Sequence, residues 1–585
     1  MGNTATDAIR RELARGESLR AAELGTDALG DDVTSADVEL IWLTALALAR
    51  SGAVERAERL AGLPGLDARL SNEPARLRSD MTALRARLIK DRALVADDEA
   101  APGLALRAAE AYAACAEEFG GYYALINAAT MFLFAGDGAR SEHAAREVLS
   151  LTDSLPSPLD YWAQVSKAEA HLLLRDVAGV AQSLREAEET DPGWGMRSTT
   201  RKQLQRICEV LGIGVDVLAA LRSKRVVHYT GHMFASGPEE HIAEQIRDLL
   251  RELDVGAVYG SLACGADLLM AETALALGVE VHAFLPCPVD EFLTQSVIGG
   301  GEEWTRRFAS VRERAQTVQV EPTRAVPDEV MFAYCDELAM GHAKLRANRL
   351  GCEMTQIAMW DGVPSTGLAG TGAAVRRWRG LGGKTEVVPL DRSRFVRAAA
   401  ADRPEPTDSP TRTRQVRGIV FLDVKGFSQL QEDQLPAFFE LVMGALAKVI
   451  AGYDSVTYRN TWGDALYLVF ATPLSAAQCA LAIQRRMATL AEELGWPGLT
   501  ARIGGHAGPV YDGFDPVCDE PTHYGTHVTR AARIEPRTPP GQVYITSDFA
   551  ALLALDPECR LRAEYVGRIP TAKAYGAFPM YVLGG

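Results

Sequence analysis

Two acidic residues in the last third of the chain lie in contexts suited to metal-assisted chemistry. Asp423 ends the apolar stretch GIVFLD and precedes the turn-forming pair Gly426-Phe427. Asp464 lies at the turn of YRNTWGDALYLVF, between two runs with strand character. Paired carboxylates attract hard divalent cations, and two ions about 3.5–4 Å apart can clamp an in-line phosphoryl displacement. Taken singly, each Asp has a purely structural alternative, as a strand terminator or as a turn former.

The elements around these two residues predict a ferredoxin-like α+β domain over residues 416–585. From Val416 the order is a strand and turn (VRGIVFLDVKGFSQL), a helix (LPAFFELVMGALAKVIAGY), the hairpin, a second helix (PLSAAQCALAIQRRMATLAEELG), a strand (LTARIGGHAGPV), a helix (YGTHVTRAARIE) and a strand (GQVYITSDF). A β-α-β-β-α-β order is the ferredoxin-like arrangement. In such a sheet the first strand and the hairpin are neighbours, so Asp423 and Asp464 are predicted to meet at one edge.

Four motifs in this region resemble class III nucleotidyl cyclases, the large adenylate/guanylate cyclase family. They are FLDVKGFSQL, NTWGDALYLVF, ARIGGHAGPV and YGTHVTRAARIE, in this order, and the resemblance covers residues 416–585. It implies conversion of a nucleoside triphosphate to a 3′,5′-cyclic nucleotide and pyrophosphate, with ATP as the first expectation. It also implies a homodimer, because in this family the metal carboxylates come from one chain and an Arg from the other.

The resemblance assigns roles to individual residues. Two Mg²⁺ or Mn²⁺ ions per site would be held by a metal group made of Asp423, Asp464 and Val424. Backbone amides in the turn would cradle phosphate, a function that needs close backbone approach; the turn residues are Lys425, Gly426 and Phe427. Arg533, in TRAAR, would stabilise charge developing on the α-phosphate, since its planar fork makes bidentate bonds to phosphate oxygens. The alternative is that Arg533 only occupies a solvated helix face.

Four positions depart from the usual pattern of the family or match it incompletely. Asn460 stands where a Lys usually reads adenine, and Thr522 stands where an Asp is frequent, although some bacterial adenylyl cyclases also use Thr there. Thr529 replaces the family's transition-state Asn. Lys573 is available for the triphosphate, one residue further than expected from Gly567. Asn offers both a donor and an acceptor whereas Lys offers only donors, so base reading is expected to differ, and GTP or a pyrimidine nucleotide stays open beside ATP.

Two other classes of function stay open. Asn460, Thr529 and Lys573 motivate a catalytically weak or inactive nucleotide-binding regulator, in which the cyclase fold serves dimerisation or sensing. A nucleotide hydrolase in the middle of the chain is the other. Both metal carboxylates are retained, which favours an active cyclase, because a decaying site would lose them freely.

Residues 223–392 predict an α/β domain of Rossmann-like type. RVVHYTGHM, GAVYG, VEVHAFLPC and MTQIAMWDG read as strands that alternate with helices such as EEHIAEQIRDLLREL. Such alternation is typical of a parallel sheet with right-handed crossovers. YGSLACGADLLMAETAL and STGLAGTGAAV resemble the SLOG superfamily, whose Rossmann-like members bind nucleotides or nucleotide-derived signals.

Gly-rich turns that enter helices present free N–H groups and a positive dipole end to phosphate. The candidate ligand-binding residues are Thr230, Gly231, Gly260, Ser261, Gly265, Asp267, Gly370 and Thr371. The alternative is that these glycines only permit tight β-α turns. The turn GLAGTG lacks the PGGxGT of the enzymatic relatives, so a sensor is expected rather than a hydrolase, with Glu272 as a lesser catalytic candidate.

Residues 1–222 predict an all-α, TPR-like solenoid. Segments such as GYYALINAATMFLFAGDGARSEHAAREVLSL repeat an apolar helix, a Gly-Asp break and an Ala-rich amphipathic helix. Helix pairs of this kind are typical of α-solenoids. GYYALINAAT also resembles the helical repeats of TRAF-binding stress-kinase regulators, which implies a regulatory surface for a protein partner. Residues 393–415, rich in Pro, Asp, Thr and Arg, are expected to be a linker.

Composition limits the remaining options. The 585 residues carry a formal net charge of −16, which disfavours a broad nucleic-acid surface. The nine cysteines are dispersed without a CxxC pair, as suits a reducing compartment. No secretory signal is expected, and no apolar run is expected to approach the roughly 18 residues of a membrane span. A cytoplasmic protein without a membrane or nucleic-acid partner is therefore expected.

Overall fold

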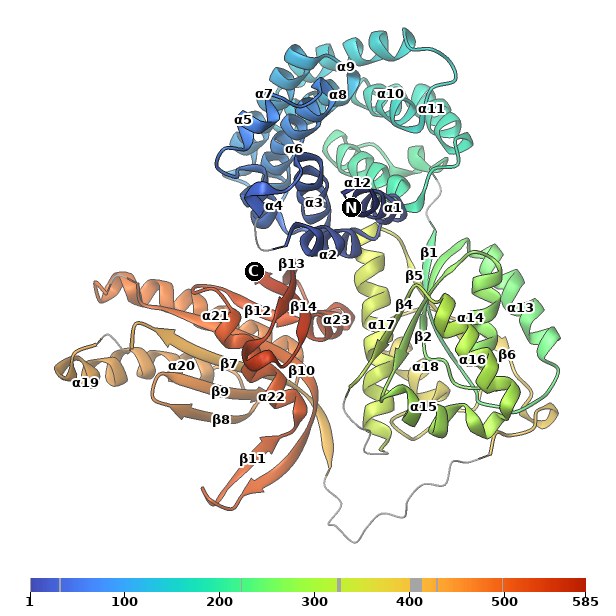
Figure 1. Cartoon of the computed structure of the whole chain (residues 1–585), viewed down its shortest axis with the longest axis vertical. Helices are drawn as coiled ribbons and strands as arrows, with labels where there is room; N and C mark the ends of the chain where they lie inside the picture. The colour runs from blue at the N-terminus through green and yellow to red at the C-terminus, as the bar shows by residue number, and fades with distance from the viewer. Residues whose placement is uncertain are drawn as a thin grey trace. The chain divides into compact units, whose positions relative to one another are not determined.

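The computed structural model describes residues 2–30, 33–221, 224–322, 328–399, 413–427, 430–496 and 498–584. The chain forms two compact units, Met1–Ser223 with Tyr565–Gly567, and Lys224–Glu564 with Arg568–Gly585. The first unit is helical and the second contains two sheets (Figure 1). Residues 400–412 of the expected linker lie outside the described residues. Phe395 and Val396 of that segment pack on the domain that contains the first sheet. Phe395 contacts Phe234 at 4.5 Å between ring centroids, and Val396 N donates to the Ser236 carbonyl.

The N-terminal unit is a succession of helices whose ends follow the sequence. Asp37, Asp137, Asp160 and Asp176 each accept hydrogen bonds from backbone N–H groups at a helix start, which satisfies donors that the helix leaves free. Many of the buried positions are Ala, so the helices can approach closely. The helices are α1 (Gly2–Arg15), α2 (Ser18–Leu29), α3 (Val38–Ser51), α4 (Val54–Ala61), α5 (Leu66–Leu70), α6 (Ala75–Ala93), α7 (Ala101–Phe119), α8 (Tyr122–Phe134), α9 (Gly138–Asp153), α10 (Tyr161–Leu173), α11 (Val177–Glu189) and α12 (Trp194–Leu211).

The first sheet of the second unit is parallel throughout its described strands, with the order β4-β3-β2-β1-β5-β6. The strands are β1 (Arg225–Gly231), β2 (Val255–Gly260), β3 (Glu280–Leu285), β4 (Thr317–Val320), β5 (Met354–Trp360) and β6 (Thr385–Pro389). The helices are α13 (Glu239–Glu252), α14 (Ala266–Ala276), α15 (Val289–Ser296), α16 (Glu302–Arg314), α17 (Glu329–Leu350) and α18 (Thr371–Gly380). The strand order reverses between β1 and β5, and open α/β sheets bind ligands outside the carboxyl ends of strands at such a point.

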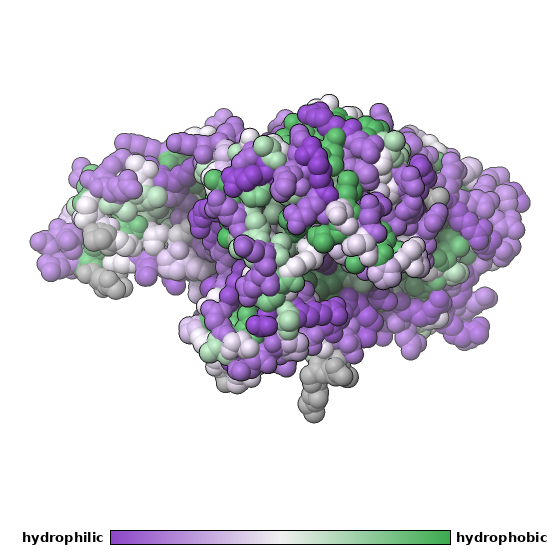
Figure 2. Space-filling model, turned by 90° about the horizontal axis from the view of Figure 1, so that it is seen from above, coloured by the Kyte–Doolittle hydropathy of each residue, from purple (hydrophilic) through white to green (hydrophobic). Residues whose placement is uncertain are grey.

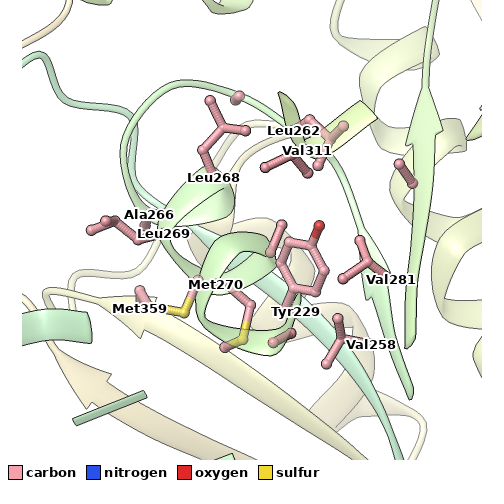
Figure 3. Close-up of a cluster of buried hydrophobic side chains, with 14 of the residues drawn as sticks. Tyr229, Val258, Leu262, Ala266, Leu268, Leu269, Met270, Val281, Val311 and Met359 are labelled. Atoms are coloured by element: carbon pink, nitrogen blue, oxygen red, sulfur yellow. The ribbon is translucent and has the colours of Figure 1, made fainter. Parts of the chain in front are cut away.

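The core of this domain lies between α14 and the sheet. Tyr229 of β1 packs among apolar side chains of α14 and the neighbouring strands (Figure 3). β1, β2 and β3 are almost continuously buried, as strands covered by helices on both faces must be. The labelled members of the cluster are Tyr229, Val258, Leu262, Ala266, Leu268, Leu269, Met270, Val281, Val311 and Met359.

The second sheet is the α+β part of the fold, with the order β13-β14-β12-β10-β7-β9-β8 and β11 paired to β10. Its strands are β7 (Arg414–Lys425), β8 (Val456–Trp462), β9 (Ala465–Phe470), β10 (Thr500–Asp515), β11 (Glu520–Tyr524), β12 (Val543–Thr546), β13 (Arg562–Pro570) and β14 (Ala577–Gly584). Its helices are α19 (Leu435–Ala437), α20 (Gly444–Ala451), α21 (Pro473–Glu493), α22 (Thr526–Ile534) and α23 (Ser547–Leu555). The strand expected for GQVYITSDF ends at Thr546, where the Thr546 side chain accepts from Phe549 N and starts α23.

One stretch of this domain has the length and apolar composition of a membrane span. Glu432–Ala451 has a mean hydropathy of 1.4, and 22% of the window is buried. The expectation that no segment approaches this length was therefore wrong, although a single helix that passes this test is weak evidence for a membrane. The face of the molecule in Figure 2 is mainly hydrophilic, with hydrophobic residues in patches between hydrophilic ones.

Candidate active site

Strand pairing brings the two acidic residues together. β7 and β9 are antiparallel, and Asp423 lies opposite Ala465, the residue that follows Asp464. The turn between β8 and β9 contains Gly463 at φ 68°, a conformation that favours Gly. Burial raises the pKa of Asp464, and the negative charge of Asp423 raises it further. The two carboxylates therefore lie at one edge of the sheet, where the sequence predicted them.

A guanidinium and a third carboxylate belong to the same cluster. Arg502 of β10 lies opposite Asp423 in the register and donates a hydrogen bond from Nη2 to Oδ2 of Asp423. Its Nε lies 3.1 Å from Oε1 of Glu535, in the short helix η8 (Glu535–Arg537). Burial raises the pKa of Glu535 to about 7 despite Arg502, and Asp423 and Asp464 add to the rise. Sequence reasoning missed both residues, although a charged residue in the apolar strand ARIGG was a signal for Arg502.

The carboxylates of Asp423 and Asp464 supply the kind of oxygen donors that a divalent cation takes. Carboxylate oxygens are the ligands that Mg²⁺ and Mn²⁺ favour. Burial raises the pKa of Asp464 and of Glu535, the neighbouring carboxylates raise both further, and a divalent cation would relieve this repulsion. Val424, the third residue assigned to the metal group, has a buried side chain, so only its backbone can contribute a ligand.

The turn predicted to cradle phosphate lies beside the carboxylates. Gly426 has φ 99°, and Lys425 is exposed. Phe427 packs against Phe438 with 4.8 Å between ring centroids, and its Cε1 lies 3.8 Å from where a Cβ on Gly463 would stand. The turn after β7 and the turn that carries Asp464 are thus neighbours.

The two residues expected to read the base lie in one region. Asn460 Nδ2 donates to Tyr458 Oη at 3.1 Å, and Asn460 Oδ1 accepts from Thr461 N at 2.7 Å. The ring of Tyr458 stands edge-on to His523, the residue after Thr522, at 6.0 Å. The Asn460 amide therefore has partners within its own hairpin, and the Tyr458–His523 contact places β11, which carries Thr522, next to β8, which carries Asn460.

Helix α22 carries the two residues assigned to transition-state stabilisation. Thr529 is exposed, and its Oγ1 donates to the Gly525 carbonyl at 3.4 Å. Arg533 is one turn further on and half-buried, and it pairs with no residue in the part of the chain that the structure describes. Lys573 is exposed at φ 58° in a short helix between β13 and β14. Thr529 and Arg533 thus share one face of α22, as their spacing of four requires.

A comparison with protein families matches residues 410–585 to the family described as adenylate and guanylate cyclase catalytic domain. The C-terminal region is an adenylate and guanylate cyclase catalytic domain. The expected α+β cyclase-type domain is therefore confirmed for this region, and the SLOG and TPR-like assignments stay predictions.

Two curated proteins are similar to part of this chain. An adenylate cyclase of Neurospora crassa is 29% identical over 159 residues, which is 22% of this chain and 7% of that protein. An adenylate cyclase of Podospora anserina is 29% identical over 161 residues, 23% of this chain and 7% of that protein. The chain thus spans 7% of the length of these curated relatives.

Among solved structures, the adenylyl cyclase CyaB from P. aeruginosa has 19% identity and a TM-score of 0.27, covering 30% of this chain and 95% of that one. The guanylate cyclase domain of RhGC from Catenaria anguillulae, in complex with GTP, has 18% identity and a TM-score of 0.26, covering 30% and 98%.

The residues proposed from the Gly-rich turns lie outside the cyclase domain, at the carboxyl edge of the parallel sheet. A Cβ on Gly231 would stand 2.4 Å from Cβ of Ala266, and one on Gly265 would stand 2.6 Å from the Phe234 nitrogen. Close packing therefore explains these two glycines without a ligand. The residues are Thr230 and Gly231 at the end of β1, Gly260 and Ser261 at the end of β2, Gly265 and Asp267 at the start of α14, and Gly370 and Thr371 at the start of α18.

Two carboxylates near this edge have different surroundings. Asp267 is 7% exposed, and its Oδ1 has no hydrogen-bond partner among the described residues; burial raises its pKa well above the usual range. Glu272 instead accepts from Arg307 Nε at 2.9 Å, and Arg307 Nη1 lies 2.7 Å from Glu239. Glu272 therefore ties α14 to α16, while Asp267 is the polar group that has a free oxygen.

Proposed function

We propose that the chain is a nucleotidyl cyclase that converts a nucleoside triphosphate to a 3′,5′-cyclic nucleotide and pyrophosphate. The observation that carries this proposal is the pairing of Asp423 with the turn of Asp464, in a domain of the cyclase family. Two Mg²⁺ or Mn²⁺ ions held there would lower the pKa of the ribose 3′-hydroxyl and neutralise the triphosphate.

In the proposed mechanism each remaining group of the chain has one task. Backbone N–H groups of the turn at Gly426 hold phosphate oxygens close to the carboxylates. Arg533 stabilises the charge on the α-phosphate through its guanidinium fork. Thr529, on the same face of α22, donates to a ribose oxygen, and Lys573 binds the triphosphate. The proposal includes a homodimer, in which Arg533 and Thr529 contact the nucleotide that is held at the carboxylates of the partner chain.

ATP is the first candidate substrate, with GTP or a pyrimidine nucleotide as alternatives. One observation favours the second proposal, a nucleotide-binding regulator with little turnover. The Asn460 amide already has partners in Tyr458 and Thr461, so reading a base would require these hydrogen bonds to be exchanged. Such a regulator would bind nucleotide without consuming it.

Incubation of the purified full chain with each of the four nucleoside triphosphates and Mn²⁺ tests the enzyme. Cyclic nucleotide and pyrophosphate should form in equal amounts with at least one substrate, and Asp423→Asn should abolish both. Asp454→Asn is the matched control, because Asp454 is exposed on a turn outside the carboxylate cluster and its loss should change nothing. Binding by calorimetry without any product would support the regulator instead.

The Rossmann-like domain is proposed to bind a nucleotide-derived ligand that controls the cyclase. The free Oδ1 of Asp267, next to the N-terminus of α14, supports a site that accepts a hydroxyl or amine donor. Titration with ADP-ribose should release heat from the full chain but not from an Asp267→Asn variant, and equal heats would count against this site. The helical unit is proposed to bind a protein partner. All nine cysteines are free, which fits the proposed cytoplasmic location.

A further inference from the structure

We propose that Glu321, which lies outside the cyclase domain, is a positioning residue for the cyclase reaction. It holds helix α22 through Arg530 and so fixes where Arg533 and Thr529 stand. This inference rests on the proposed function, and it adds a residue of the Rossmann-like domain to the residues that serve the reaction.

The ion pair that carries the inference is buried and two-pronged. Arg530 Nη2 lies 2.9 Å from Oε1 of Glu321, and Nη1 lies 3.4 Å from Oε2. The side chains are 3% and 9% exposed. Asp548 of α23 lies 3.5 Å from Nη1 of Arg530 and supplies a second buried carboxylate. Burial alone would lower the pKa of Arg530, but Glu321 and Asp548 raise it instead, so the guanidinium stays charged inside the protein.

A buried guanidinium restricts the movement of its helix strongly, because it must stay paired with the carboxylates around it. Breaking a buried pair by removing one partner leaves an uncompensated charge, which is far more costly than losing a surface pair. Helix α22 has nine residues, and Arg530 lies at its middle. A turn of the helix about its axis, the simplest way to re-expose Arg530, would also move Arg533, three residues on.

Further contacts show that Glu321 acts within a packed surface. Tyr334 of α17 donates to the Ala507 carbonyl of β10 at 2.9 Å, fully buried. Asp328, before α17, pairs with Arg414 of β7 at 2.6 Å. A Cβ on Gly341 would stand 2.4 Å from the Ala551 carbonyl oxygen, so the backbones of α17 and α23 approach each other closely at this point. The cyclase domain and the Rossmann-like domain therefore meet in a defined register.

At its C-terminal end, helix α22 leads to the carboxylate cluster. Glu535 follows α22 directly, and Arg502 joins it to Asp423. The Glu321 anchor and the Glu535 contact thus hold α22 at its middle and at its end. A shift of α22 would therefore change both the positions of Thr529 and Arg533 and the surroundings of Asp423.

Glu321→Gln in the full chain tests the inference, because it keeps the shape and removes the charge. The amides of α22 should exchange hydrogen faster than in the unchanged protein, and kcat should fall about tenfold while KM changes less than about twofold. Glu321→Asp, which keeps the charge, should recover most of kcat. Glu353→Gln is the matched control, since Glu353 pairs with Arg225 at 74% exposure in the same domain, and both readouts should stay unchanged.

Each outcome decides a separate claim. Unchanged exchange in α22 would overturn the anchoring, and faster exchange with unchanged kcat would overturn the positioning role. Equal loss of kcat in Glu321→Gln and Glu321→Asp, together with a general loss of melting temperature, would reduce Glu321 to a structural residue. If the unchanged protein turns over none of the four nucleotides, the proposed function fails, while the exchange comparison still decides whether Glu321 holds α22.

Discussion

Arg502 occupies the position where a divalent cation would have to compete for Asp423. Its guanidinium contacts Asp423 and lies 3.1 Å from Glu535, so it supplies positive charge to the carboxylate cluster before any metal binds. Replacing Arg502 by Gln removes this charge and keeps a hydrogen-bond donor. We expect the Arg502→Gln variant to bind Mn²⁺ more tightly, because the ion then meets uncompensated carboxylates.

The size of this effect follows from distance and exposure. Two unit charges about 4 Å apart interact by about 4 kcal/mol at an effective dielectric constant of 20. The side chains of Arg502 and Asp423 are 32% and 26% exposed, so solvent screening leaves about 1–2 kcal/mol of this interaction. Since each 1.4 kcal/mol is tenfold in affinity, the dissociation constant for Mn²⁺ should fall by roughly 5-fold to 30-fold.

Isothermal titration of the full chain with MnCl₂ in the absence of nucleotide measures this affinity directly, apart from any activity. Arg486→Gln is the matched control, because it removes the same charge from an ion pair with Glu493 on α21. Added salt should reduce the difference only moderately, since the cluster is partly buried. Unchanged or weaker Mn²⁺ binding in Arg502→Gln would refute the idea that Arg502 competes with a metal for Asp423.

Three further perturbations test other features. Gly341→Ala should lower the free energy of unfolding by about 1–3 kcal/mol in urea titrations, because its Cβ would stand 2.4 Å from the Ala551 carbonyl; an unchanged midpoint would contradict the close contact of α17 with α23. Burial lowers the pKa of His527 to about 4, so the unfolded chain binds more protons than the native one between pH 4 and 6.5. The free energy of unfolding should therefore fall by roughly 3 kcal/mol through this group as the pH falls from 6.5 to 4. Urea titrations at pH 7.5 and 5.0 should show a smaller difference in the free energy of unfolding between the two pH values for His527→Gln than for the unchanged chain. Glu535, with a pKa raised to about 7, changes stability in the opposite direction with pH, but equally in both proteins. An equal difference in the two proteins would contradict a buried, neutral His527. Asn460→Lys should raise the preference for ATP among the four triphosphates by about tenfold in kcat/KM, which corresponds to one good charge-assisted hydrogen bond; an unchanged preference would place base reading elsewhere.

The pairing of Asp423 with Asp464 could be predicted because it depends on neighbouring elements. A hairpin with a Gly-Asp turn next to an apolar strand fixes which residues share an edge, and Gly463 takes the positive φ that such a turn needs. Arg502 was open to the same reasoning, since antiparallel pairing of its strand with β7 places it opposite Asp423. The stretch Glu432–Ala451 was missed although its length and composition can be read from the sequence, because Glu440 and Lys448 interrupt the apolar run.

Arg530 marks the point where such reasoning ends. In THVTRAARI the buried positions of α22 are His527, Arg530, Ala531 and Ile534, which follow the three-and-four spacing of one helix face. That spacing alone places Arg530 on the inner face and Arg533 at its border. A guanidinium on an inner face requires a carboxylate, so the sequence predicts that a partner exists. It does not identify Glu321, 209 positions earlier, because that choice depends on how two separate sheets pack. The residue that anchors the cyclase helix is therefore one that no motif of the cyclase domain contains.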